Sequence, residues 1–110
     1  MESTEEKIQQ MQLLEQNLQN FLMQRQQFQL QLIEIESALD ELKGKEDAYK
    51  IVGSIMVLTK ADSIRKELEE KKSTLDIRIS SLEKQESRIR DKTGALRKEV
   101  LEAIQNKKEN

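Results

Sequence analysis

Two long stretches with heptad spacing flank a short β-like island, and this interruption constrains the fold more than any other feature. Residues 49–58 read Tyr-Lys-Ile-Val-Gly-Ser-Ile-Met-Val-Leu, with β-branched and apolar residues on both sides of Gly53 and Ser54. Glycine at the first central position suits a two-residue type II′ turn, which predicts a β-hairpin over 48–59. The alternative is continuous helix through 45–60, because short apolar runs are ambiguous.

The expected hairpin has two faces that are both largely apolar. Pairing outward from the turn sets Ile51 opposite Met56 and Tyr49 opposite Leu58 on one face, while Lys50 is the one charged member of the other. A neighbouring helix could cover only one face, and a two-stranded hairpin alone is marginally stable in water. We therefore expect it to pair with hairpins of other chains. The expected oligomerisation residues are Tyr49, Ile51, Val52, Ile55, Met56, Val57 and Leu58.

Each flanking stretch carries a seam of residues at alternating spacings of three and four, which predicts helices over 4–43 and 60–108 packed as a coiled coil. Only Arg25 interrupts the first seam. Its side chain either reaches solvent or a facing glutamate, or sets the register between the helices, and the sequence does not separate these possibilities. The seams are Met11, Leu14, Leu18, Phe21, Arg25, Phe28, Leu32, Ile35, Leu39 and Leu42, and Lys72, Leu75, Ile79, Leu82, Glu86, Ile89, Thr93, Leu96, Val100 and Ala103.

The expected helices are too long for a compact domain, because a rise of about 1.5 Å per residue makes them roughly 60 and 75 Å long. The hairpin between them reverses the chain direction, so the two helices can lie antiparallel. We predict a mainly α fold over 1–110, a single domain built as a long antiparallel two-helix coiled coil with one central β-hairpin.

Antiparallel packing would bring the start of the first helix next to the end of the second. More apolar side chains gather there than one seam can bury, and leucine and methionine make adaptable contacts with varied partners. We expect these residues to form a binding surface, although they could instead only close the coiled coil. They are Ile8, Met11, Leu13, Leu14, Leu18, Val100, Leu101 and Ile104.

Composition excludes several classes of function. Charged residues make up 36% of the chain and aromatic residues 3%, which is typical of long helices with solvated faces. The net charge is −2 with both signs interspersed, which argues against a nucleic-acid-binding face. The chain has no cysteine or histidine and no glycine-rich loop, so we expect no enzymatic, metal or nucleotide site. It has neither a membrane-spanning apolar run nor a signal peptide, so a cytoplasmic protein is expected.

Two segments resemble the β-type subunit of prefoldin. They are Asp-Ala-Tyr-Lys-Ile-Val-Gly-Ser-Ile-Met-Val at 47–57 and Leu-Glu-Lys-Gln-Glu-Ser-Arg-Ile at 82–89. The resemblance covers nearly the whole chain, and a single hairpin is typical of β-type subunits, whereas α-type subunits carry two. It leaves open whether the source is archaeal or eukaryotic.

The resemblance implies a hetero-hexamer of two α-type and four β-type subunits, whose hairpins form inter-subunit β-barrels. It also implies an ATP-independent chaperone, a holdase, that captures unfolded polypeptides at its coiled-coil tips and passes them to a group II chaperonin. No cofactor, nucleic acid or membrane is implied. The alternative function is a structural coiled-coil scaffold or tether that binds no client.

Overall fold

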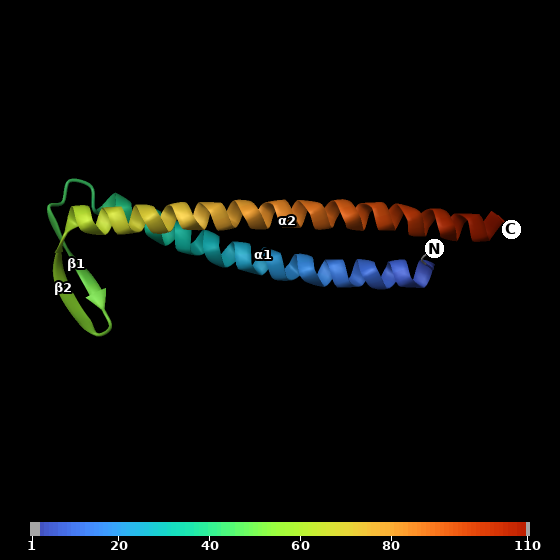
Figure 1. Cartoon of the computed structure of the whole chain (residues 1–110), viewed down its shortest axis with the longest axis horizontal. Coiled ribbons are helices and arrows are strands. Elements are labelled where there is room, and N and C mark those ends of the chain that lie inside the picture. Colours follow the sequence, from blue (N-terminus) through green and yellow to red (C-terminus); the bar gives the residue numbers. More distant parts are fainter. Residues whose placement is uncertain (1–2, 110) are drawn as a thin grey trace. The chain divides into compact units, whose positions relative to one another are not determined.

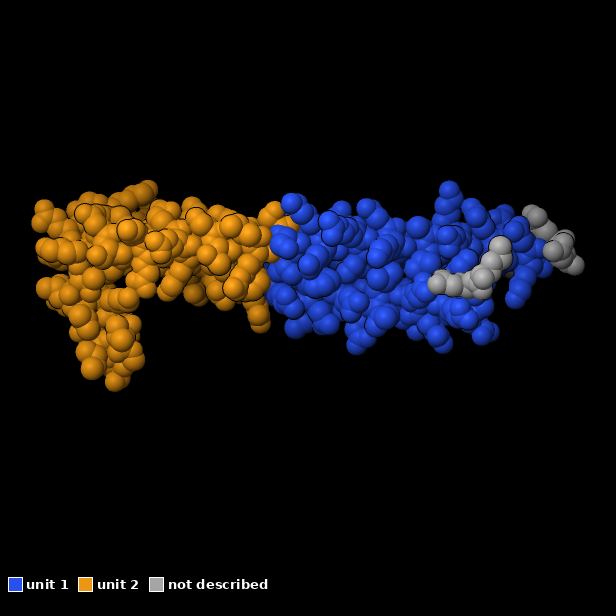
Figure 2. Space-filling view, in the orientation of Figure 1, with its two compact units in different colours: residues 1–25, 81–110 blue, residues 26–80 orange. Residues whose placement is uncertain are grey.

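The structure, a computed structural model, describes residues 3–109 and has two helices joined by one hairpin (Figure 1). Its elements are α1 (Thr4–Glu41), β1 (Asp47–Val52), β2 (Ile55–Lys60) and α2 (Ala61–Glu109). The chain divides into two compact units (Figure 2). Residues 1–25 and 81–110 form the first, here called the helical unit, and residues 26–80 form the second, called the hairpin unit. The mainly α fold with one central hairpin is confirmed.

Helix α1 begins and ends at signals that the sequence carries. The Glu6 amide donates to Ser3 Oγ at 3.1 Å, which satisfies one of the free N–H groups of the first turn. At the other end Gly44 has a φ of +73°, as is usual for the glycine that follows a helix. The helix ends at Glu41, before the expected residue 43, because the Lys43 amide bonds to the carbonyl of Asp40 at 3.2 Å in a tighter turn.

Strands β1 and β2 form an antiparallel hairpin with the predicted register. Tyr49 pairs with Leu58 and Ile51 with Met56. Gly53 has a φ of +63°, and no described residue other than glycine has a positive φ, so the turn is type II′ rather than type I′. The alternative of continuous helix through this segment is wrong.

The core of each unit is the seam between α1 and α2. In α2 most of its apolar members are buried, with Leu96 and Ala103 half-buried, whereas the seam of α1 is half-buried from Met11 to Leu39 and buried at Leu42. Two polar members of the α2 seam, Glu86 and Thr93, are also buried. The predicted seams are therefore the surfaces along which the helices pack. The buried apolar residues of the α2 seam are Leu75, Ile79, Leu82, Ile89 and Val100.

The hairpin passes into α2 with no connecting residue, since β2 ends at Lys60 and α2 begins at Ala61. Ala61 is fully buried, and its amide donates to the carbonyl of Glu46 at 2.9 Å. This bond closes the base of the hairpin and gives the first amide of α2 a partner. Strand and helix are thus joined without a loop within the hairpin unit.

Arg65 ties the end of α1 to the start of α2. Its Nη2 donates to the carbonyl of Leu42 at 2.7 Å and to that of Lys45 at 2.6 Å, and its Nη1 pairs with the carboxylate of Asp62. The Leu42 carbonyl also accepts from the Lys45 amide at 3.1 Å, so the guanidinium adds a charge-assisted hydrogen bond there and another at the Lys45 carbonyl, in the turn that follows α1. Sequence reasoning missed this contact.

Candidate interaction surfaces

The hairpin leaves its apolar side chains exposed on both faces. All seven predicted oligomerisation residues lie in this hairpin, with exposed fractions from 45% at Val57 to 69% at Ile51. Contiguous exposed apolar surface on a chain that is otherwise polar marks an interaction site. The hairpin is therefore the first candidate surface.

One charged side chain of the hairpin, that of Lys50, is held by α2. Lys50 Nζ donates to both carboxylate oxygens of Glu67, at 2.8 and 3.1 Å. The hydrogen bond from Lys50 and then its charge hold the pKa of Glu67 below its ordinary value. The apolar face that contains Lys50 thus presents a neutralised charge. Sequence reasoning missed this pair, because the two residues lie 17 positions apart.

The second predicted surface lies in the helical unit, and its eight residues differ in exposure. Ile8, Leu13, Leu101 and Ile104 are exposed, with Leu13 and Leu101 each at 59%. Val100 is buried in the seam. The remaining residues, which are half-buried, are Met11, Leu14 and Leu18.

Other apolar residues off the seam lie in or near the hairpin unit. Met23, Leu30 and Ile33 are exposed, whereas Leu22 is half-buried. Ile77 is the most exposed large apolar side chain, at 72%, and sequence reasoning missed it. Its position between the seam residues Leu75 and Ile79 was the available signal. Met23, Leu30 and Ile33 widen the set of apolar side chains that could meet a partner.

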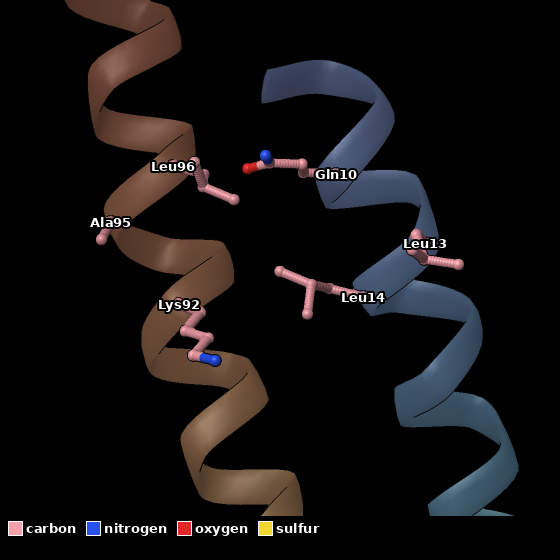
Figure 3. Close-up of a pocket in the computed structure, with 6 residues that line it drawn as sticks. All are labelled: Gln10, Leu13, Leu14, Lys92, Ala95 and Leu96. Atoms are coloured by element: carbon pink, nitrogen blue, oxygen red, sulfur yellow. The ribbon is translucent and has the colours of Figure 1, made fainter. Parts of the chain in front are cut away.

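One hollow of about 390 Å³ opens between the two helices of the helical unit. In Figure 3 the side chains of Leu14 and Leu96 point into the space between the helices, and Lys92 extends towards the same space. Leu13 points away from α2. We call this hollow the leucine groove. It is lined by Gln10, Leu13, Leu14, Lys92, Ala95 and Leu96.

Two further hollows in the helical unit contain other predicted residues. One of about 340 Å³ is lined by Ile8, Met11 and Val100 together with Gln12 and Glu15. The other, of about 230 Å³, includes Glu15 and Leu18 among its lining residues. Each of these hollows is lined by residues of both helices, so a partner at any of them would contact α1 and α2 together.

A buried ion pair crosses the seam of the helical unit. Arg25 Nε lies 2.7 Å from Glu86 Oε2, and Glu86 is only 2% exposed. The hydrogen bond to Glu86 raises the pKa of Arg25, so the guanidinium stays charged. Arg25 therefore reaches a facing glutamate, and only one register of the two helices joins these charges.

The described residues contain no cluster of side chains that could hold a metal ion. No helix among them is long and apolar enough to cross a membrane. The chemistry available at both surfaces is thus apolar contact with a few charges at the margins.

A sequence model of the prefoldin subunit family matches residues 5–107. The chain belongs to the prefoldin subunit family. Prefoldin subunit beta of Archaeoglobus fulgidus is 43% identical over 86 residues, which cover 76% of this chain and 74% of the relative. Prefoldin subunit beta of Thermococcus kodakarensis is 37% identical over 98 residues, which cover 86% of this chain and 84% of the relative.

The fold agrees with a solved structure of the same type. The crystal structure of the prefoldin beta subunit from Thermococcus strain KS-1 matches with a TM-score of 0.85 and 34% identity, covering 91% of this chain and 90% of that one. The resemblance to β-type prefoldin subunits is confirmed. Prefoldin subunits form a family of non-enzymatic chaperone subunits that assemble with one another.

Proposed function

We propose that this chain is the β-type subunit of an ATP-independent cytoplasmic holdase, which captures unfolded polypeptides at its coiled-coil tips and delivers them to a group II chaperonin. One observation carries the proposal: Leu13, Leu101 and Ile104 are exposed beside a seam that closes without them. Aliphatic side chains that packing does not use are available to a client.

Assembly of the subunit rests on the hairpin. Both of its faces are apolar and exposed, and edge-to-edge pairing with other hairpins would bury them. We propose a hexamer of two α-type and four β-type subunits whose hairpins form β-barrels. The ion pair between Lys50 and Glu67 supports this, because it removes a free charge from the surface to be buried.

Client capture rests on reversible apolar contact. Covering apolar surface contributes roughly 25 cal/mol per Å², so several exposed leucine and isoleucine side chains could supply micromolar affinity after the cost of association. The candidate client residues remain Ile8, Met11, Leu13, Leu14, Leu18, Val100, Leu101 and Ile104. Val100 would contribute by shaping the tip, since it is itself buried.

The test replaces Leu13, Leu101 and Ile104 together by serine in the hexamer formed with an α-type partner. Hexamer mass by native mass spectrometry, thermal melting and suppression of aggregation of a denatured model protein are measured on the same samples. We expect an intact hexamer with weakened suppression, equal with and without ATP. The matched control is Ile77→Ser, which also removes an exposed aliphatic side chain from α2.

Two outcomes would contradict the proposal. Unchanged suppression in the triple variant would move the client site towards Met23, Leu30 and Ile33. A wild-type hexamer that suppresses no aggregation would instead favour a structural coiled-coil scaffold without client binding.

A further inference from the structure

The charges beside the leucine groove are mostly positive and come from α2. Residues 88–98 of α2 contain five basic residues and one acidic residue, Asp91. The facing part of α1, residues 8–24, contains a single charged residue, Glu15. Glu15 lines two further hollows of the helical unit, one of them together with Arg90 and Arg97, and it does not line the leucine groove. Positive charge near the groove is therefore not balanced from α1.

The same basic residues lack ion-pair partners among the described residues. Six cations of the hairpin unit pair with carboxylates, but those of residues 88–98 form no ion pair with any residue that the structure describes. Glu99, one turn beyond Leu96 on the same side of α2, is engaged by Lys7 at 3.3 Å. The unpaired cations are Arg88, Arg90, Lys92, Arg97 and Lys98.

Two of these cations lie beside the groove. Lys92 lines it, and Arg88 precedes Lys92 by four residues, which sets both side chains on one side of α2. Lys92 thus sets one positive charge at the edge of the aliphatic floor from Leu14 and Leu96, and Arg88 sets a second one turn further along the same side of α2; neither forms an ion pair with a described residue.

We infer that the leucine groove selects unfolded segments in which an apolar side chain is flanked by aspartate or glutamate. This inference rests on the proposed function and names the class of client that it favours. The apolar side chain enters between Leu14 and Leu96, and the carboxylates on the side of the segment that runs along α2 towards Arg88 meet Lys92 and Arg88. Charges at an exposed site add little affinity but discriminate between partners, so the effect is a preference among clients.

A nucleic acid fits the groove less well. The groove has no aromatic side chain on which a base could stack, and the whole chain carries a net charge of −2. The floor is aliphatic, which matches a polypeptide side chain better than a sugar–phosphate backbone.

The experiment compares three labelled peptides with one shared apolar core and with glutamate, glutamine or lysine on both flanks. Binding to the complete hexamer is measured by fluorescence anisotropy. The glutamate peptide is expected to bind about fivefold more tightly than the glutamine peptide, because each exposed charge contact is weak. The lysine peptide should bind most weakly, and high salt should remove the differences. Equal binding of the three peptides at low salt would overturn the inference.

Lys92→Glu tests the residue directly and should reverse the order of the peptides. Lys66→Glu is the matched control, because Lys66 is exposed on α2 in the hairpin unit and the change in charge is the same. If the affinity order of the three peptides is unchanged in Lys92→Glu, the groove does not select clients by charge. The same conclusion follows if Lys66→Glu changes the affinity order as much as Lys92→Glu does.

Aggregation suppression measured in parallel separates this inference from the proposed function. A hexamer that protects a denatured protein but binds all three peptides equally would refute the selectivity alone. Loss of both protection and peptide binding would refute the holdase function with it. Displacement of the glutamate peptide from wild type, but not from Lys92→Glu, by a single-stranded oligonucleotide would assign the cations to nucleic acid and overturn the inference.

Discussion

Arg25 and Glu86 join the two helices through a buried charged hydrogen bond, with Arg25 Nε 2.7 Å from Glu86 Oε2. Glu86 is buried, and its second carboxylate oxygen, Oε1, has no hydrogen-bond partner among the described residues. The pair is thus incompletely satisfied, and its contribution to specificity can be separated from its contribution to stability.

Arg25→Ala should lower the free energy of unfolding by about 3 kcal/mol, because it leaves the Glu86 carboxylate buried without a cation. Replacing both residues by leucine should restore stability to within about 1 kcal/mol of wild type, since a well-packed apolar pair avoids the desolvation cost. Urea unfolding at fixed protein concentration measures both effects. If Arg25→Ala lowers the free energy of unfolding by less than about 1 kcal/mol, water reaches the Glu86 carboxylate.

Arg65→Ala should destabilise the hairpin unit by about 2 kcal/mol, because two charge-assisted hydrogen bonds to backbone carbonyls are lost. Hydrogen exchange should become faster at the end of α1 and in the turn that follows it. Lys66→Ala removes a neighbouring charge that has no such contacts and should change neither quantity. Equal effects of the two variants would show that the carbonyl contacts contribute nothing.

Gly94→Ala should raise stability by about 1 kcal/mol, the usual gain for alanine over glycine inside a helix. A Cβ at this position would meet no atom within 4 Å, so the change introduces no clash. Gly53→Ala is the contrasting variant. Its positive φ should make the same substitution destabilising, even though space is equally open there. Thermal melting of both variants checks the opposite signs.

The ion pair between Lys50 and Glu67 predicts a dependence on pH. Since the folded state lowers the pKa of Glu67 from 4.5, the pair stabilises the fold fully above that value. Its contribution is lost as the pH falls through the lower folded pKa. The stability difference between wild type and Glu67→Gln should therefore shrink on acidification below about pH 4.5. A difference that stays constant down to about pH 2 would mean that the pair does not form in solution.

Ile55→Asp should prevent assembly with an α-type partner, because a carboxylate on the hairpin would be buried at the interface without a partner, at a cost of several kcal/mol. Light scattering should detect smaller species. Ile77→Asp places the same charge at an equally exposed position on α2 and should leave the assembly intact. A full hexamer with Ile55→Asp would remove the hairpin from the interface.

Local patterns were enough to predict the hairpin register and both seams. Gly53 fixes the turn, and once the turn is fixed a period of two decides which side chains pair. The heptad spacing likewise separates Val100, which is buried, from Leu101, which is exposed. These features follow from spacings of a few residues and need no knowledge of the folded chain.

The contacts of long polar side chains could not be predicted in the same way. Arg65 binds carbonyls 20 and 23 residues away, and Arg25 meets Glu86 across 61 residues. Several partners are possible for such a side chain, and the choice depends on distances that only the folded chain fixes. The unpaired cations beside the leucine groove were hidden for the same reason, since the even overall mixture of charges says nothing about which of them find partners.

The direct passage from Lys60 in β2 to Ala61 in α2 has a mechanical consequence. With no linker at the junction, and with the Ala61 amide bonded to Glu46, a hairpin held in a sheet would also hold the first turns of α2 at a set angle. A rotation of α2 would then also rotate the hairpin strands, because no flexible loop lies between them. The junction would therefore transmit rotation of the helix to the sheet, and even one glycine inserted between these two residues would make it flexible.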